Sequence, residues 1–246
     1  MSQNTRSDIR LFCFPFAGAG ASFYNGWNEL LGDSAEVVPI QLPGRERQIA
    51  EEPYRRIQAA ADDFARMIEA QSDGRPAALF GHCFLGATMA FEVASRLETG
   101  GKVPVLRLFV SAASSPGGTR SYSMSSYDDD RFLEEVAKLT GYTHHAFSIP
   151  DLRELLMPAL RADFEMDETY AAVPGVMLKA PITALYAAGD SFVSKEAVER
   201  WEDFTTGGFK LVEVQGEHMY ITGTPEQATA VMARELAGKE GAHPHG

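Results

Sequence analysis

Short apolar runs that alternate with longer amphipathic segments are the feature of this sequence that most limits its fold. Six runs have the length and composition of buried strands, and the segments between most of them have helical spacing. The predicted strands are residues 10–16, 36–42, 76–82, 105–113, 181–189 and 209–216. Such alternation is typical of a parallel sheet covered by helices. We therefore predict an α/β fold with a mostly parallel, doubly wound sheet.

One long interruption separates the fourth and fifth predicted strands. Residues 116–175 contain no clear strand, and we interpret them as a helical lid inserted over the strand ends. Helices are predicted within it near 128–139, 151–158 and 159–171, and outside it at 22–31, 56–71, 85–98, 194–204 and 225–237. The chain thus reads as a single domain, 1–246, with a disordered tail at about 238–246.

Length, composition and charge exclude several classes of function. The 246 residues, 45% of them apolar, suit one domain with a substantial core. A membrane span and export are not expected, because no 18-residue apolar run or apolar signal core is present. A formal net charge of −12 argues against nucleic acid as a partner. We expect a cytoplasmic monomer; an acidic partner would need a basic patch, for which Arg45, Arg47, Arg55 and Arg56 are candidates.

The segment FGHCFLGA, residues 80–87, lies where the third strand runs into a helix. In α/β-hydrolases a strand–turn–helix with the pattern G-x-S-x-G carries the nucleophile. Here Cys83 occupies the serine position, and the second glycine, Gly86, comes one residue late. A thiol in a reducing compartment can serve as a nucleophile once it is ionised. The segment therefore predicts a variant α/β-hydrolase elbow.

Three reactive side chains follow predicted strands in the order nucleophile, acid, base. They are Cys83 after the third strand, Asp190 after the fifth and His218 after the sixth. Ligands of open α/β sheets bind at these carboxyl ends. An imidazole takes the proton of the thiol and returns it to the leaving group, while a carboxylate orients the imidazole. The order and the positions predict a Cys83–His218–Asp190 triad.

Each of these residues alone has an ordinary structural explanation. A free cysteine is often a small buried hydrophobe, which is our interpretation of Cys13. An aspartate after a strand is usually a turn or cap residue, and a histidine in a Gly-Glu-His loop is usually a surface residue. Four other histidines are assigned to solvent or the tail: His144, His145, His243 and His245. No metal-ligand spacing is found, and no metal or other cofactor is expected.

The triad requires an oxyanion hole and a substrate channel nearby. The expected backbone donors are the N–H of Phe84 and one from the loop PFAGAG, where Ala17 or Phe16 is the candidate. Phe16, Leu85 and Met219 are the predicted substrate contacts beside the triad. Apolar lid residues are candidates for an acyl channel, with ordinary helix packing as the alternative: Phe132, Leu133, Leu155, Leu156, Met157, Leu160 and Phe164.

Five segments give the sequence a specific resemblance over about residues 10–236. They are FCFPFAGAGASFYNGW, VVPIQLPGRERQ, LMPALRADFEMDETY, PITALYAAGDSFVS and GEHMYI. They resemble the type II thioesterases of polyketide and nonribosomal peptide pathways, which hydrolyse acyl groups from the phosphopantetheine of carrier proteins. The resemblance implies an acyl or peptidyl carrier protein as partner and no other cofactor. It also implies Cys83 as nucleophile, Asp190 as acid, His218 as base, and Ala17 and Phe84 as oxyanion donors.

The elbow departs from the family pattern G-H-S-M-G-A in its cysteine and its additional residue. An acyl-Cys83 intermediate keeps thioester reactivity, which favours transfer to an amine, thiol or carbanion over hydrolysis. The alternatives are therefore hydrolysis and a non-hydrolytic release. A more distant resemblance to cysteine-dependent Dieckmann cyclases is weakened because SAASSPG, residues 111–117, lacks a carboxylate. An inactive relative that binds acyl chains or carriers, and a small-molecule esterase, also stay open.

Overall fold

A single parallel sheet of six strands organises the chain. The computed structural model describes residues 7–118, 123–141 and 144–238. The strands lie in the order β2-β1-β3-β4-β5-β6, and every neighbouring pair is parallel. Their bounds are β1 Arg10–Phe14, β2 Glu36–Pro39, β3 Ala77–His82, β4 Val105–Ser111, β5 Ile182–Ala187 and β6 Phe209–Val214. The predicted fold class is confirmed, and all six predicted strands are present with shorter bounds.

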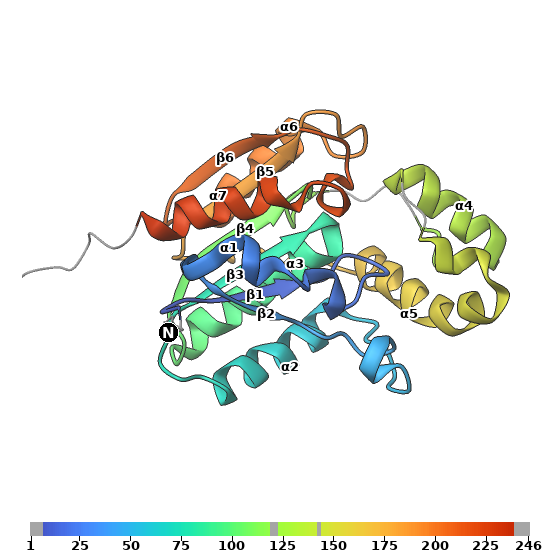
Figure 1. The fold of residues 1–246 in the computed structure, drawn as a ribbon, viewed down its shortest axis with the longest axis horizontal. Coiled ribbons are helices and arrows are strands. Elements are labelled where there is room, and N and C mark those ends of the chain that lie inside the picture. Colours follow the sequence, from blue (N-terminus) through green and yellow to red (C-terminus); the bar gives the residue numbers. More distant parts are fainter. Residues whose placement is uncertain (1–6, 119–122, 142–143, 239–246) are drawn as a thin grey trace, which may run out of the picture.

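Helices cover both faces of the sheet (Figure 1). On one face α2 (Ile57–Ala70) packs against α3 (Cys83–Gly100). On the other face α1 (Trp27–Leu31) packs against α7 (Pro225–Ala237). Two predicted helices are shorter than expected: residues 22–31 divide into the 3-10 turn Ala21–Tyr24 and α1, and residues 194–204 divide into α6 (Lys195–Glu199) and the 3-10 turn Arg200–Phe204.

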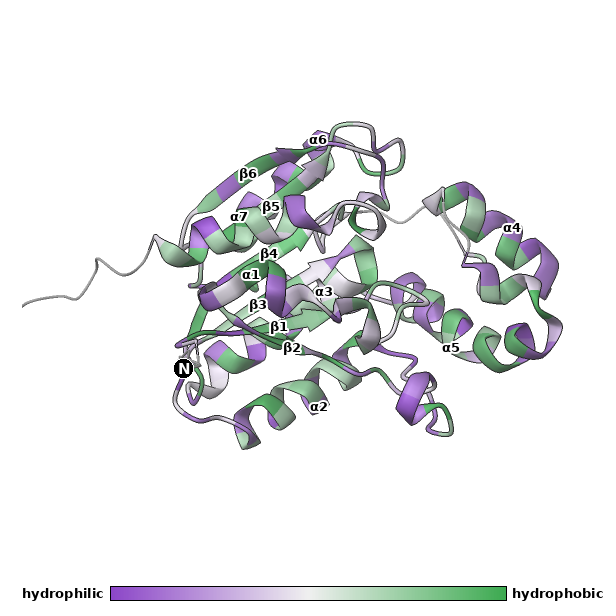
Figure 2. Cartoon of the chain, in the orientation of Figure 1, coloured by the Kyte–Doolittle hydropathy of each residue, from purple (hydrophilic) through white to green (hydrophobic). Residues whose placement is uncertain are grey.

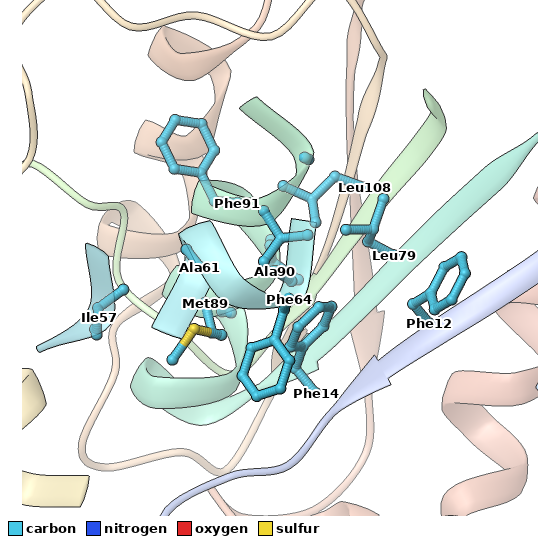
Figure 3. Close-up of a cluster of buried hydrophobic side chains, with 14 of the residues drawn as sticks. Phe12, Phe14, Ile57, Ala61, Phe64, Leu79, Met89, Ala90, Phe91 and Leu108 are labelled. Carbon is cyan, nitrogen blue, oxygen red and sulfur yellow. The ribbon is translucent and has the colours of Figure 1, made fainter. Parts of the chain in front are cut away.

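Two apolar cores, one on each face, explain why the central strands are continuous hydrophobic runs. All six residues of β3 are buried, because helices cover both faces of this central strand. Figure 3 shows the core beneath α2 and α3, where Phe14 and Phe64 meet edge to face with ring centroids 6.2 Å apart. The strands are mostly green in Figure 2, whereas the outer helices mix green and purple. Within the described residues, no helix combines the length and apolar character needed to cross a membrane.

The segment predicted as a lid lies between β4 and β5 and stands to one side of the sheet in Figure 1. It contains α4 (Asp129–Thr140), the 3-10 turn His145–Ser148 and α5 (Pro150–Glu168). The predicted break near residue 158 is wrong, because α5 continues through Pro158. The predicted disordered tail falls on residues 239–246, outside the described part of the chain.

Candidate functional site

The turn between β3 and α3 is a strained elbow that exposes a sulfur. Cys83 is the first residue of α3 and has φ +57°, a conformation that costs a non-glycine residue about 1–2 kcal/mol. Gly81 lies so close to α3 that a Cβ there would be 2.0 Å from the carbonyl oxygen of Gly86. The additional residue of the elbow is thus accommodated at the start of the helix, and Gly86 makes the close approach to β3.

The close approach at Gly81 leads to a stability prediction. Gly81→Ala is expected to lower the free energy of unfolding by about 3 kcal/mol or more, because neither backbone can yield without moving the elbow. Thermal unfolding of wild type and variant tests this. Gly223→Ala is the matched control, since a Cβ there has a single neighbour, the Tyr220 carbonyl oxygen at 3.9 Å. Equal melting temperatures for wild type and Gly81→Ala would contradict the proposed close packing.

The structure brings the three predicted triad residues together in one hydrogen-bonded chain. The Sγ of Cys83 lies 3.2 Å from His218 Nε2, and His218 Nδ1 lies 2.8 Å from Asp190 Oδ2. The other carboxylate oxygen of Asp190 accepts the backbone N–H groups of Phe192 at 2.8 Å and Val193 at 2.9 Å. The carboxylate is thereby fixed in position and orients the imidazole toward the sulfur.

The loops after β5 and β6 are joined, which explains why residues 28 positions apart meet. The N–H of Gly189 donates to the carbonyl of Gly216 at 2.8 Å, one residue before Asp190 and two before His218. Parallel neighbouring strands end at the same edge of the sheet, so their following loops lie side by side. The carboxylate and the imidazole therefore come from adjacent strand ends, as the sequence predicted.

The environment of His218 favours its charged form. Burial of the ring lowers its pKa, but the negative charge and hydrogen bonding of Cys83 and Asp190 outweigh burial and raise the pKa to about 10. The sulfur also lies at the N-terminus of the 18-residue helix α3, whose dipole stabilises an anion. The imidazole is therefore charged at neutral pH and lies beside the sulfur.

A second histidine lies behind the first and remains neutral. His82 is fully buried, its ring centroid is 5.8 Å from that of His218, and burial lowers its pKa well below the usual value. Its Nδ1 is 3.0 Å from Ser111 Oγ, which in turn lies 2.7 Å from the hydroxyl of Tyr220. No role for His82 is predicted from the sequence, although it lies in the elbow segment FGHCFLGA.

A cavity of about 520 Å³ opens beside the sulfur. All five residues predicted for the oxyanion hole and the substrate contacts line it, together with Cys83: Phe16, Ala17, Phe84, Leu85 and Met219. Four of the predicted lid contacts line it as well: Leu133, Leu156, Leu160 and Phe164. An apolar cavity reaching a reactive sulfur is suited to an acyl chain.

Three of the candidate lid residues do not line the cavity. Phe132 and Met157 pack inside the lid, in a cluster that also contains Val136, and are 0% and 4% exposed. Leu155 points outward and is 51% exposed. The helical period places these residues on other faces of α4 and α5 than those facing the cavity. Cys13, by contrast, is completely buried in β1 as expected.

Arg45 is not a surface residue, so the predicted basic patch loses one member. Its guanidinium forms a two-pronged ion pair with Asp163 of α5, at 2.8 Å and 2.7 Å, and the two side chains are 5% and 0% exposed. Arg47, Arg55 and Arg56 remain exposed, with Arg55 paired to Glu165. Arg45 and Asp163 lie in the segments VVPIQLPGRERQ and LMPALRADFEMDETY, but their pairing is not predicted from the sequence. Among the described residues, no group of three His, Cys, Asp or Glu side chains is placed to share a metal ion.

Comparisons with known proteins match nearly the whole chain to one family. The thioesterase domain family matches residues 9–235. The gramicidin S biosynthesis protein GrsT of Aneurinibacillus migulanus is 30% identical over 236 residues, covering 95% of this chain and 91% of that protein. A probable cadicidin biosynthesis thioesterase of Streptomyces griseus is 34% identical over 228 residues, 93% of this chain but 62% of that protein. The solved structure of the type II thioesterase BorB, from the borrelidin biosynthetic cluster, superimposes with a TM-score of 0.84 at 32% identity, covering 96% of this chain and 94% of BorB.

Proposed function

Because this chain belongs to the thioesterase domain family, we propose that it cleaves acyl thioesters of carrier proteins through an acyl-Cys83 intermediate. The substrate is an acyl or peptidyl group on the phosphopantetheine thiol of a carrier protein in polyketide or nonribosomal peptide biosynthesis. Relatives named for such pathways support the substrate class. The observation that carries the proposal is the hydrogen-bonded chain Cys83–His218–Asp190 beside the apolar cavity.

Acylation follows from the geometry of the sulfur and the imidazole. The thiolate of Cys83 attacks the thioester carbonyl carbon, forming a C–S bond and a tetrahedral oxyanion. The N–H groups of Ala17 and Phe84 are the proposed donors to this oxyanion, and one such donor typically contributes about 3 kcal/mol in the transition state. The intermediate collapses as the C–S bond to pantetheine breaks, and the departing sulfur takes the proton of the His218 imidazolium.

Release of the acyl group repeats these roles in reverse. Neutral His218 takes a proton from the acceptor, which attacks the acyl-Cys83 carbonyl, and the Cys83 thiolate leaves. With water as acceptor the product is a free acid, which is the hydrolysis that the family relationship favours. With an amine, thiol or carbanion as acceptor the product is a transferred or cyclised acyl group, which the retained thioester reactivity of acyl-Cys83 favours. This second outcome is the alternative function.

A competition experiment distinguishes the two outcomes. Wild type is mixed with a medium-chain acyl-pantetheine thioester, with and without a primary amine or a second thiol. Intact-protein mass spectrometry follows the adduct, and chromatography follows the products. We expect an adduct on Cys83 that forms faster than it decays. Decay to free acid at a rate independent of acceptor identifies a hydrolase, whereas decay that accelerates with acceptor and yields its acyl derivative identifies a transferase.

Two outcomes of these measurements would contradict the proposed function. If no acyl-Cys83 adduct forms and no thioester is consumed, the inactive acyl- or carrier-binding relative becomes the better interpretation. If simple aryl esters are hydrolysed much faster than pantetheine thioesters, the protein is a small-molecule esterase. Either result contradicts action on carrier thioesters.

A further inference from the structure

The loop that supplies one proposed oxyanion donor is held by residues from two distant parts of the chain. This β1 loop, Pro15–Gly20, follows β1 and contains Ala17. The N–H of Gly18, the residue after Ala17, donates to Asp163 Oδ2 at 2.8 Å. The carbonyl of Ala19 accepts from Arg45 Nη1 at 3.0 Å. Ala17 therefore sits next to a backbone segment fixed by a lid residue and by a residue that follows β2.

The ion pair that joins these two side chains is fully enclosed. Arg45 and Asp163 are 118 positions apart, and both lie against the cavity that contains Cys83. A buried ion pair adds little net stability relative to an apolar pair of similar volume, because both charges lose their hydration. What it provides is a defined geometry, since a guanidinium and a carboxylate fit together in one orientation.

Glu46, next to Arg45, holds the 3-10 turn Ala21–Tyr24 that directly follows this loop. Its carboxylate accepts the N–H of Ser22 at 3.1 Å and also the Ser22 hydroxyl. Gly20 leaves the room for it, because a Cβ there would be 2.2 Å from Glu46 Oε1. Within the loop, the N–H of Ala19 donates to the carbonyl of Phe16 at 3.0 Å. The turn around Ala17 is thus closed internally and anchored on both sides.

We propose that Arg45 and Asp163 are positioning residues that orient the Ala17 amide through the docking of lid helix α5. Asp163 belongs to α5, so displacement of α5 would withdraw an acceptor from Gly18 and a partner from Arg45. Seating of the lid and completion of the oxyanion hole then form one structural event. This inference rests on the proposed function, because it assumes that Cys83 attacks a thioester carbonyl.

Two reactions of the Cys83 sulfur distinguish a role in positioning the oxyanion donor from a role in holding the fold together. Acylation of Cys83 passes through an oxyanion, whereas alkylation by iodoacetamide displaces iodide and forms no oxyanion. In Asp163→Asn we expect the acylation rate with an acyl-pantetheine thioester to fall on the order of 100-fold. The iodoacetamide rate is expected to stay near that of wild type. Both rates are read by intact-protein mass spectrometry.

A second variant guards against misfolding, because Asp163→Asn leaves the Arg45 charge buried. The double variant Arg45→Met, Asp163→Leu replaces the ion pair by apolar side chains that fill similar space. It is expected to unfold cooperatively like wild type and still to show the selective loss of acylation. Glu165→Gln is the matched control: it removes the exposed partner of Arg55 from the same helix and leaves the β1 loop untouched.

The possible results have distinct meanings. A fall in acylation alone, in both ion-pair variants and not in Glu165→Gln, supports the inference. Acylation and alkylation that fall together with the melting temperature would show a structural role and overturn it. Wild-type acylation rates in the double variant would overturn it as well. Wild type that is alkylated but never acylated would refute the proposed function, and the inference with it.

Discussion

Replacement of Cys83 by alanine is expected to lower turnover of acyl-pantetheine thioesters by at least about a thousandfold. The sulfur lies 3.2 Å from His218 Nε2, at a strained helix start that faces the cavity. Without it no covalent intermediate forms, and the remaining activity would come from binding and from oxyanion donors. Steady-state turnover and the disappearance of the acyl adduct in intact-protein mass spectra measure the effect.

Two further variants show whether the loss of turnover is specific to the Cys83 thiol. Cys13→Ala removes the other cysteine of the sequence, which is completely buried in β1. This variant is expected to keep both the adduct and turnover. Cys83→Ser places a hydroxyl at the same elbow and would form an oxoester, which is less reactive toward amines and thiols. The fraction of acyl groups passed to a competing acceptor is expected to fall in Cys83→Ser. Substantial turnover in Cys83→Ala would contradict covalent catalysis.

The positions of the strands could be predicted because parallel strands buried on both faces leave a strong signal. AALFGH of β3 is apolar or small at nearly every position, and all of it is buried. Reactive residues that follow such runs must gather at one edge of the sheet. This is why Cys83, Asp190 and His218 could be grouped from sequence, although 135 positions separate Cys83 from His218.

The additional residue in the elbow was the part of the site that sequence spacing left uncertain. In the structure the sulfur still reaches His218, and Gly86 lies against Gly81. Leu85, where the usual pattern has glycine, is 2% exposed and packs in the core while also bordering the cavity. The outcome depends on how one helical turn packs against β3, which residue spacing alone does not determine.

The errors concern the lid and the ion pair, where side-chain partners decide the outcome. Two helices are predicted at 151–158 and 159–171, yet α5 is one continuous helix with Pro158 inside it, although proline usually interrupts a helix. Arginines in a charged stretch are usually exposed, yet Arg45 finds Asp163 and is buried. The burial of Arg45 does not follow from local sequence, because its partner Asp163 lies 118 positions away.

Replacement of His218 by alanine is expected to lower acylation of Cys83 at pH 7 on the order of 1000-fold. In the proposed mechanism the imidazolium stabilises the attacking thiolate and protonates the departing pantetheine sulfur. The pKa of His218 is about 10, so in wild type the charged ring is present throughout the neutral range and is lost only as pH rises through about 10. In the variant, Cys83 loses the imidazole that lies 3.2 Å from its sulfur.

The pH dependence of iodoacetamide alkylation provides the decisive measurement. Wild type is expected to react faster than His218→Ala at neutral pH, because the variant lacks the charged ring beside the sulfur. This advantage of wild type is expected to disappear as pH rises through about 10, where the His218 ring loses its charge. Asp190→Asn should lie between them, because removing the carboxylate charge removes one cause that raises the pKa of His218. His145→Ala, an exposed histidine of the lid, is the matched control and should follow wild type. Superimposable profiles for wild type and His218→Ala would show that Cys83 ionises independently of His218, and a thiolate–imidazolium mechanism would then be untenable.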